Sequence, residues 1–167
     1  VNETSSPTEY EASGTGSTLN VTTLTTALAS SNVVVNTGSS GTEQGDITVA
    51  TDVQWFENTK LTLDAAGSIS LSGSTTIFAA GGSLDLQAGS NISQGSESEI
   101  RVTGTTDLSA DGNITLNEST NELQGTVTIG GDSNAAAGTV NLVNNRALNL
   151  DSVSAGDVIL ATASGSD

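Results

Sequence analysis

Carboxylates are the most numerous side chains in this chain that could do chemistry. Its 167 residues include 19 Asp and Glu, three Lys and Arg, no His and no Cys. Nucleophilic and general acid–base catalysis most often use His, Cys or another base held near neutral pH, so the commonest catalytic arrangements are excluded. The lack of Cys also excludes disulfides and zinc–thiolate sites. Any catalysis would therefore have to depend on carboxylates.

A carboxylate site that cleaves polysaccharides is the enzymatic alternative. It would need several acids beside a base, and the candidates are Asp85, Arg101, Asp107 and Glu118. In the three-sided coil inferred below, these residues are expected on different sides or at corners, with no outward column that gathers several acids with a base. We therefore predict that the chain is not an enzyme, and we keep a polysaccharide-active enzyme as the minor alternative.

Oxygen-rich turns could bind calcium, because hard cations take carboxylate and amide oxygens as ligands. The candidate turns are Asp111-x-Asn113, Asp132-x-Asn134 and the segment 81–85, which partly matches the glycine–aspartate nonapeptide of calcium-binding β-rolls. The nonapeptide spacing is wrong and does not recur. We expect these Asx residues to cap turns, leave a bound Ca²⁺ open as the alternative, and predict no other cofactor.

Two pairs of residues could form a contact surface. Phe78 and Arg101 are 23 residues apart, and if one coil has that length their outward side chains lie about 4.8 Å apart along the stack. They would form a cation–π contact or, if both are accessible, a patch for a sugar or a neighbouring protein. Trp55 and Phe56 could stack on a sugar, but the alternation of apolar residues predicts that Trp55 fills the core.

The charge excludes several partners. The formal net charge is −16, with Lys60, Arg101 and Arg146 as the only Lys or Arg residues. Binding to nucleic acid or to anionic membranes needs clustered cations, so neither is expected. No apolar stretch approaches the length of about 18 residues that a membrane span needs, so no membrane insertion is expected.

The elements that must position these residues are short strands in a repeat. From Leu61 to Ile100, the first apolar residue of each apolar-x-apolar segment follows the last by 8, 8, 7, 8 and 8 residues. Three steps give a period of about 23 residues, as from Leu61 to Leu84 and from Ile69 to Ile92. The flanking apolar residues of each segment point inward and its central residue points outward.

This period predicts an all-β fold, a parallel β-helix (β-solenoid) with about 22–24 residues in each three-sided coil. Ile69, Ile92 and Ile114 should then form one inward column, and Leu61 and Leu84 another. A meander of hairpins is the structural alternative, although two-residue hairpin turns are sparse. We expect about five coils and loops at 117–124 and 130–138.

The chain divides into four segments. Residues 1–18 are expected to form a polar tail or linker, and 19–46 the first coil or a cap, with a short helix within 22–30 before a strand at 33–35. Residues 47–160 form the solenoid, and 161–167 a C-terminal tail.

Several phrases are similar to the repeat region of bacterial exoproteins of the filamentous haemagglutinin type, which are exported by two-partner secretion. They are Leu24-Thr-Thr-Ala-Leu28, Asn32–Val35, Gly45–Val49 with Trp55, and Leu61–Leu71. The resemblance covers roughly Leu19 to Ala161. It implies a right-handed parallel β-helix that serves as an adhesin, a surface stalk or a toxin-delivery stick.

Together these features predict a non-catalytic structural or adhesive module of a secreted or surface bacterial protein, located outside the cell. Its partner would be a second copy, a cell-surface protein or a glycan. The alternative is the subunit of an extracellular filament, in which the N-terminal segment adds a strand to a neighbour or coil ends stack.

Overall fold

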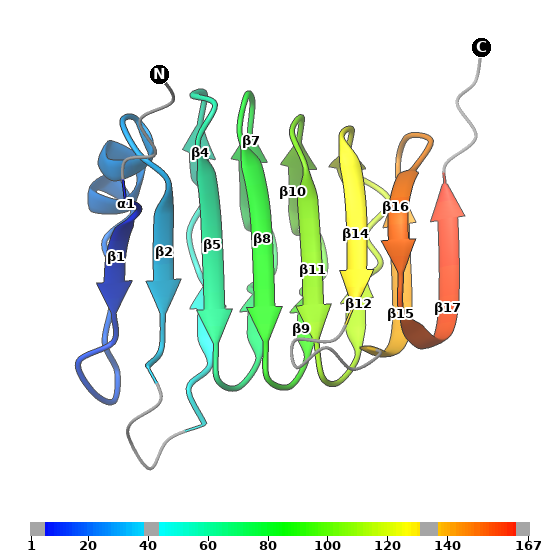
Figure 1. Cartoon of the computed structure of the whole chain (residues 1–167), viewed down its shortest axis with the longest axis horizontal. Coiled ribbons are helices and arrows are strands. Elements are labelled where there is room, and N and C mark those ends of the chain that lie inside the picture. Colours follow the sequence, from blue (N-terminus) through cyan, green and yellow to red (C-terminus); the bar gives the residue numbers. More distant parts are fainter. Residues whose placement is uncertain (1–5, 39–43, 131–136, 163–167) are drawn as a thin grey trace.

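The computed structural model describes residues 6–38, 44–130 and 137–162. Its strands wind into a three-sided stack of about six coils, a β-solenoid (Figure 1). The predicted fold is therefore confirmed, and the hairpin meander is wrong because the strands pair in parallel.

Each coil passes through three parallel sheets, here called A, B and C. Sheet A contains, in spatial order, β1 (Thr8–Glu11), β2 (Val33–Asn36), β5 (Lys60–Ala65), β8 (Ser83–Ala88), β11 (Thr106–Ala110), β14 (Thr126–Gly130) and β16 (Asn149–Val153). Sheet B contains β3 (Ile47–Val49), β6 (Ile69–Leu71), β9 (Ile92–Gln94), β12 (Ile114–Leu116), β15 (Ala137–Asn144) and β17 (Ala155–Thr162). Sheet C contains β4 (Val53–Trp55), β7 (Thr76–Ala79), β10 (Glu99–Val102) and β13 (Glu122–Leu123).

The core is a set of aliphatic columns that run along the stack. Ile69 pairs in register with Ile92, and Ile92 with Ile114, while Leu61 pairs with Leu84. All five side chains are 0–1% exposed. Both predicted columns are thus confirmed. The stack has more than the five coils expected, because β2 already belongs to the first coil with β3 and β4.

Glycine and short polar side chains shape the corners. A Cβ on Gly104 would collide with the carbonyl oxygen of Gly82 in the preceding coil, and one on Gly125 would collide with that of Gly104. Only glycine therefore lets the coils approach at this corner. At the corner between sheets A and B, the side chain of Asn91 accepts a hydrogen bond from the Asn113 backbone N–H at 2.8 Å.

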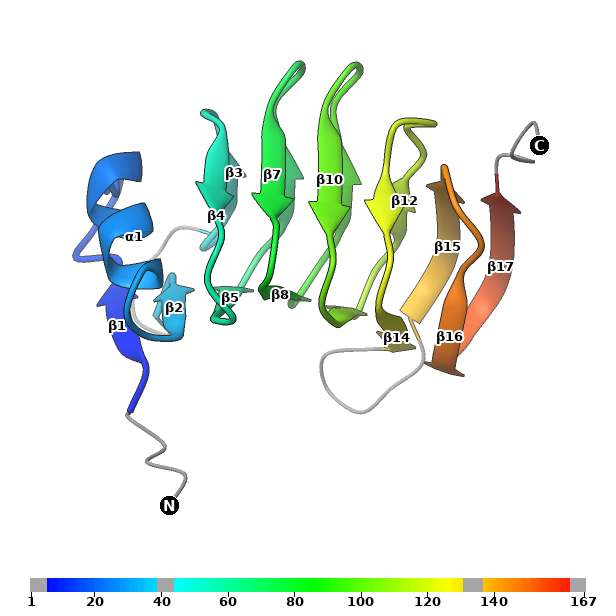
Figure 2. The ribbon, with the colours of Figure 1, turned by 90° about the horizontal axis from the view of Figure 1, so that it is seen from above.

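The N-terminal end is covered by an element that the sequence did not reveal. Residues 8–11, predicted to lie in a polar tail, form β1, which pairs in parallel with β2. Composition hid this strand because its stability comes from backbone hydrogen bonds, while Glu9 and Glu11 stay exposed. The predicted helix is present as α1 (Val21–Leu28), capped by Asn20 and buried through Leu24 and Leu28 (Figure 2).

Two other predicted boundaries change. The expected loop 117–124 contains β13, and the C-terminal tail expected from residue 161 begins later, because β17 continues to Thr162. Residues 131–136 of the loop expected at 130–138 lie outside the described residues, as do 1–5 and 163–167 of the two expected tails. Within the described part of the chain, no helix is long and apolar enough to cross a membrane.

Candidate functional site

The outer face of sheet C carries the largest set of interacting side chains. Its outward positions pair in register from coil to coil, from Gln54 to Phe78, Arg101 and Glu122. Phe56 follows directly after β4 and contacts Phe78. We call Phe56, Phe78, Arg101, Glu122 and Arg146 the sheet C column.

The aromatic end of the sheet C column is partly open to solvent. Arg101 Cζ lies 4.9 Å from the centroid of the Phe78 ring, so the predicted neighbours form a cation–π contact. Phe56 meets Phe78 in an edge-to-face arrangement, with 6.2 Å between centroids and 79° between planes. The exposed fraction of Phe56 is 64%, so this ring remains accessible beyond the contact.

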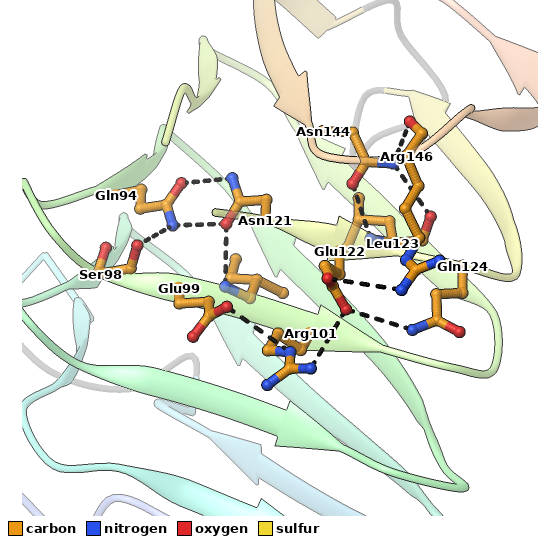
Figure 3. A network of polar contacts seen from close by, with 11 residues as sticks. Gln94, Ser98, Glu99, Arg101, Asn121, Glu122, Leu123, Gln124, Asn144 and Arg146 are labelled. Atoms are coloured by element: carbon orange, nitrogen blue, oxygen red, sulfur yellow. Dashed lines mark hydrogen bonds and ion pairs between the residues drawn. The ribbon is translucent and has the colours of Figure 1, made fainter. Parts of the chain in front are cut away.

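The charged end of the sheet C column is balanced by its own ion pairs. Arg101 Nη2 lies 3.3 Å from Glu122 Oε2, and its Nε lies 3.6 Å from Glu99 Oε1 (Figure 3). Glu122 also accepts an ion pair from Arg146 at 3.7 Å. Two of the chain's three cations therefore lie on this one face, each beside a carboxylate. The face carries little net charge on a strongly acidic molecule.

A buried amide network lies behind this face (Figure 3). Asn121, which is 1% exposed, accepts hydrogen bonds from the Ile100 backbone N–H at 2.9 Å and from Gln94 Nε2 at 2.8 Å. Its Nδ2 donates to Gln94 Oε1 at 2.9 Å and to the carbonyls of Leu116 and Val143. Both ends of the Asn121 amide are therefore satisfied inside the solenoid.

A second amide closes the last edge of sheet C. Asn144 is 0% exposed, its Oδ1 accepts from the Leu123 N–H at 2.8 Å, and its Nδ2 donates to the Leu123 carbonyl at 3.2 Å. A neighbouring strand would offer the same donor and acceptor to β13. The Asn144 side chain thus replaces a strand where sheet C ends.

Sequence reasoning missed both amides because 117–124 was expected to be a loop. A usable signal existed, since Asn121 and Asn144 are separated by 23 residues, which is the coil period.

Trp55 lies in the core, where the alternation placed it. Its exposed fraction is 1%, and its Nε1 donates to the Thr59 carbonyl at 3.1 Å. The buried indole has no free face for a sugar, so only Phe56 of this pair is available for an external contact.

The acidic residues of sheet A correct one sequence expectation. Asp85 and Asp107 are in register on neighbouring coils, so two acids share an outward column, and Lys60 lies 3.2 Å from Asp85 Oδ2. The expectation that no column gathers acids with a base is therefore wrong. The cause is that Lys60 lies at the start of β5, directly beside this column. The same Asp85 oxygen accepts from Gln87 at 3.0 Å. Arg101 lies on sheet C, away from this group.

The candidate calcium turns serve the backbone where they are described. Asn113 Oδ1 accepts from the Thr139 N–H at 2.9 Å, which is a turn contact between coils. Asp132 and Asn134 lie outside the described residues. Among those residues, no group of three His, Cys, Asp or Glu side chains is placed to hold a metal.

The larger of two described cavities lies at the N-terminal end, with a volume of about 760 Å³. It is bounded by β1, α1 and the outer edge of β3, and its lining includes Tyr10, Val35, Ile47 and the acids Glu11 and Asp46. It shares no lining residue with the sheet C column.

Comparison with known families adds one likeness. Residues 58–130 match a family described as repeats of unknown function, DUF5649. This segment contains β5 to β14, the most regular part of the solenoid. No curated protein and no solved structure matches the chain.

Proposed function

We propose that this chain is a non-catalytic structural module, a stiff segment of a secreted or surface protein that also provides an adhesive face. The observation that supports this most is the uninterrupted stack of coils with a dry aliphatic core. Such a stack separates what lies at its two ends and exposes three long faces. The resemblance to exported bacterial exoproteins supports an extracellular location.

The polar side chains also favour a structural role over an enzymatic one. Lys60 is paired with Asp85, and Arg101 with Glu99 and Glu122. These groups neutralise each other along the faces instead of converging on a cavity. The polysaccharide-active alternative would have to use the pair Asp85 and Asp107.

An extracellular location has a direct test. An antibody raised against the chain should label intact cells of the source organism or their culture medium. Permeabilised cells provide the total signal, and an antibody against a cytoplasmic enzyme provides the control for lysis. Labelling that requires permeabilisation would contradict the proposal.

The adhesive part of the proposal is assigned to the sheet C column. Phe56 is the one large apolar side chain outside β16 and β17 among the described residues that is strongly exposed. It lies beside the Phe78 ring and the balanced Arg and Glu side chains. An aromatic face with fixed polar neighbours suits a glycan or a protein loop better than it suits a polyanion.

This face is tested by measuring how the chain binds to a panel of immobilised glycans and cell-surface proteins. Phe56→Ala should weaken whatever binding is found by on the order of tenfold, because an exposed aromatic anchor typically contributes more than 1 kcal/mol. Thr115→Ala on the outer face of sheet B is the matched control and should change nothing. Equal loss in both variants, or in neither, would exclude the sheet C column as the contact.

The filament alternative receives less support. It needs the N-terminal segment to add a strand to a neighbour, whereas β1 already pairs with β2 of its own chain. It also needs two complementary coil ends, and the two ends differ, as considered next.

A further inference from the structure

The C-terminal coil exposes residues that belong to the core. Val158 and Leu160 of β17 pair in register with the buried Val140 and Leu142, and yet their exposed fractions are 43% and 37%. On sheet A, Leu150 pairs with the buried Val127 and is 37% exposed. Every residue of β16 is exposed. The inward columns therefore reach this end with nothing stacked on them among the described residues.

The same end has two open strand edges. β16 and β17 are the terminal strands of sheets A and B, so one side of each backbone lacks a strand partner in the described chain. Exposed edges with apolar side chains are sites of strand addition. Sheet C differs, because the Asn144 amide already occupies the edge of β13. A partner must therefore match sheets A and B and is not needed on sheet C.

The surface that matches such an end is another coil end of this kind. Each coil in the stack buries the inward residues of the next one in this way, as Val140 and Ile114 do at 0% exposure. The N-terminal end is a poor match, because β1 extends sheet A one coil beyond β3 in sheet B, so the two edges are not level. The helix α1 also covers the core there, through the buried Leu24 and Leu28.

We propose that the C-terminal coil binds the C-terminal coil of a second copy, in a two-fold arrangement that joins the open edges of sheets A and B. Both copies offer the same apolar residues, so the contact is self-complementary and closes as a dimer. The strands of the two copies would run antiparallel across the joint, a pairing that backbone hydrogen bonds accept. The inference depends on the coil geometry and not on the adhesive role.

Charge controls this contact. Asp151 and Asp157 are exposed beside the apolar residues, and both copies bring them to the joint. The whole chain carries −16 at pH 7 and has a sequence pI near 4.1. Lowering the pH protonates carboxylates and weakens the repulsion between copies, so the dimer should become more populated as the pH falls from 7 toward that pI.

The test measures mass and backbone protection together on the unmodified chain. Multi-angle light scattering across a concentration series should give a mass that rises from 16.6 kDa toward twice that value, at lower concentration near pH 5 than at pH 7. Hydrogen exchange should slow with concentration in β16 and β17. Added salt at pH 7 should act in the same direction as acid, because it screens the repulsion.

Two substitutions in neighbouring residues locate the contact. Val158→Lys places a charge on the inward column and should abolish the dimer. Ile159→Lys makes the same charge change at the adjacent outward position, which is 57% exposed, and should retain it. Circular dichroism checks that both variants fold. If Val158→Lys does not fold, the concentration-dependent exchange of the unmodified chain still decides the question.

Four outcomes would overturn the proposal. They are a mass that stays at 16.6 kDa from pH 7 to pH 5 at all concentrations, protection that develops in β1 and β3 instead, fibres that grow without limit, and β17 amides that exchange slowly in a monomer. The last would mean that the chain covers its own end. A monomer would leave the structural role intact, so the two proposals can fail separately.

Discussion

Aspartate in place of Ile92 should lower the free energy of unfolding by about 3 to 5 kcal/mol, because it leaves an unpaired charge in the dry core. Ile92 is 0% exposed and lies between Ile69 and Ile114 in the sheet B column. A domain of ordinary stability has only about 5 to 15 kcal/mol to lose, so this variant should be largely unfolded under mild denaturing conditions.

Urea unfolding followed by circular dichroism measures the effect. The matched control is Ser93→Asp, one residue along β9, where the side chain lies on the outward side and is half-buried. Its free energy of unfolding should change by no more than about 0.5 kcal/mol. If both aspartates cost the same, the inward register of β9 is wrong.

The fold could be predicted because its causes repeat in the sequence. The alternation of apolar and polar residues sets which side chains point inward, and the 23-residue step from Ile69 to Ile92 sets which of them stack. Each coil repeats both signals, so an irregular coil does not hide the period. The contact between Phe78 and Arg101 followed from the same step, since residues one period apart become neighbours along the stack.

The ends of the solenoid could not be predicted in this way, because there the backbone and single side chains act without repetition. β1 pairs through its backbone although its residues are largely polar. Asn144 replaces a strand with one amide, and such an Asn looks in sequence like any turn residue. The acids of sheet A were misjudged because Lys60 lies beside their column rather than in it. A periodic argument covers columns and does not cover neighbours at a strand's first residue.

Replacing Asn121 with leucine should lower the free energy of unfolding by about 3 to 6 kcal/mol. The two side chains are similar in size, but leucine removes the acceptor of the Ile100 N–H and the donor to Gln94 Oε1 and to the Leu116 and Val143 carbonyls. Each buried polar group that loses its only partner costs about 1 to 3 kcal/mol, and two or three groups are left without one.

The coils around β10 and β13 should fail first in this variant, because Asn121 joins Gln94, Ile100 and Val143 across successive coils. Hydrogen exchange should therefore accelerate in 99–102 and 122–123 before it does in β5 and β6. Asn141→Leu, the same substitution at an outward position of β15, is the control and should shift the urea midpoint little. A midpoint for Asn121→Leu equal to that of the control would mean that water or a neighbouring group replaces the amide, and that the network does not stabilise the end of sheet C.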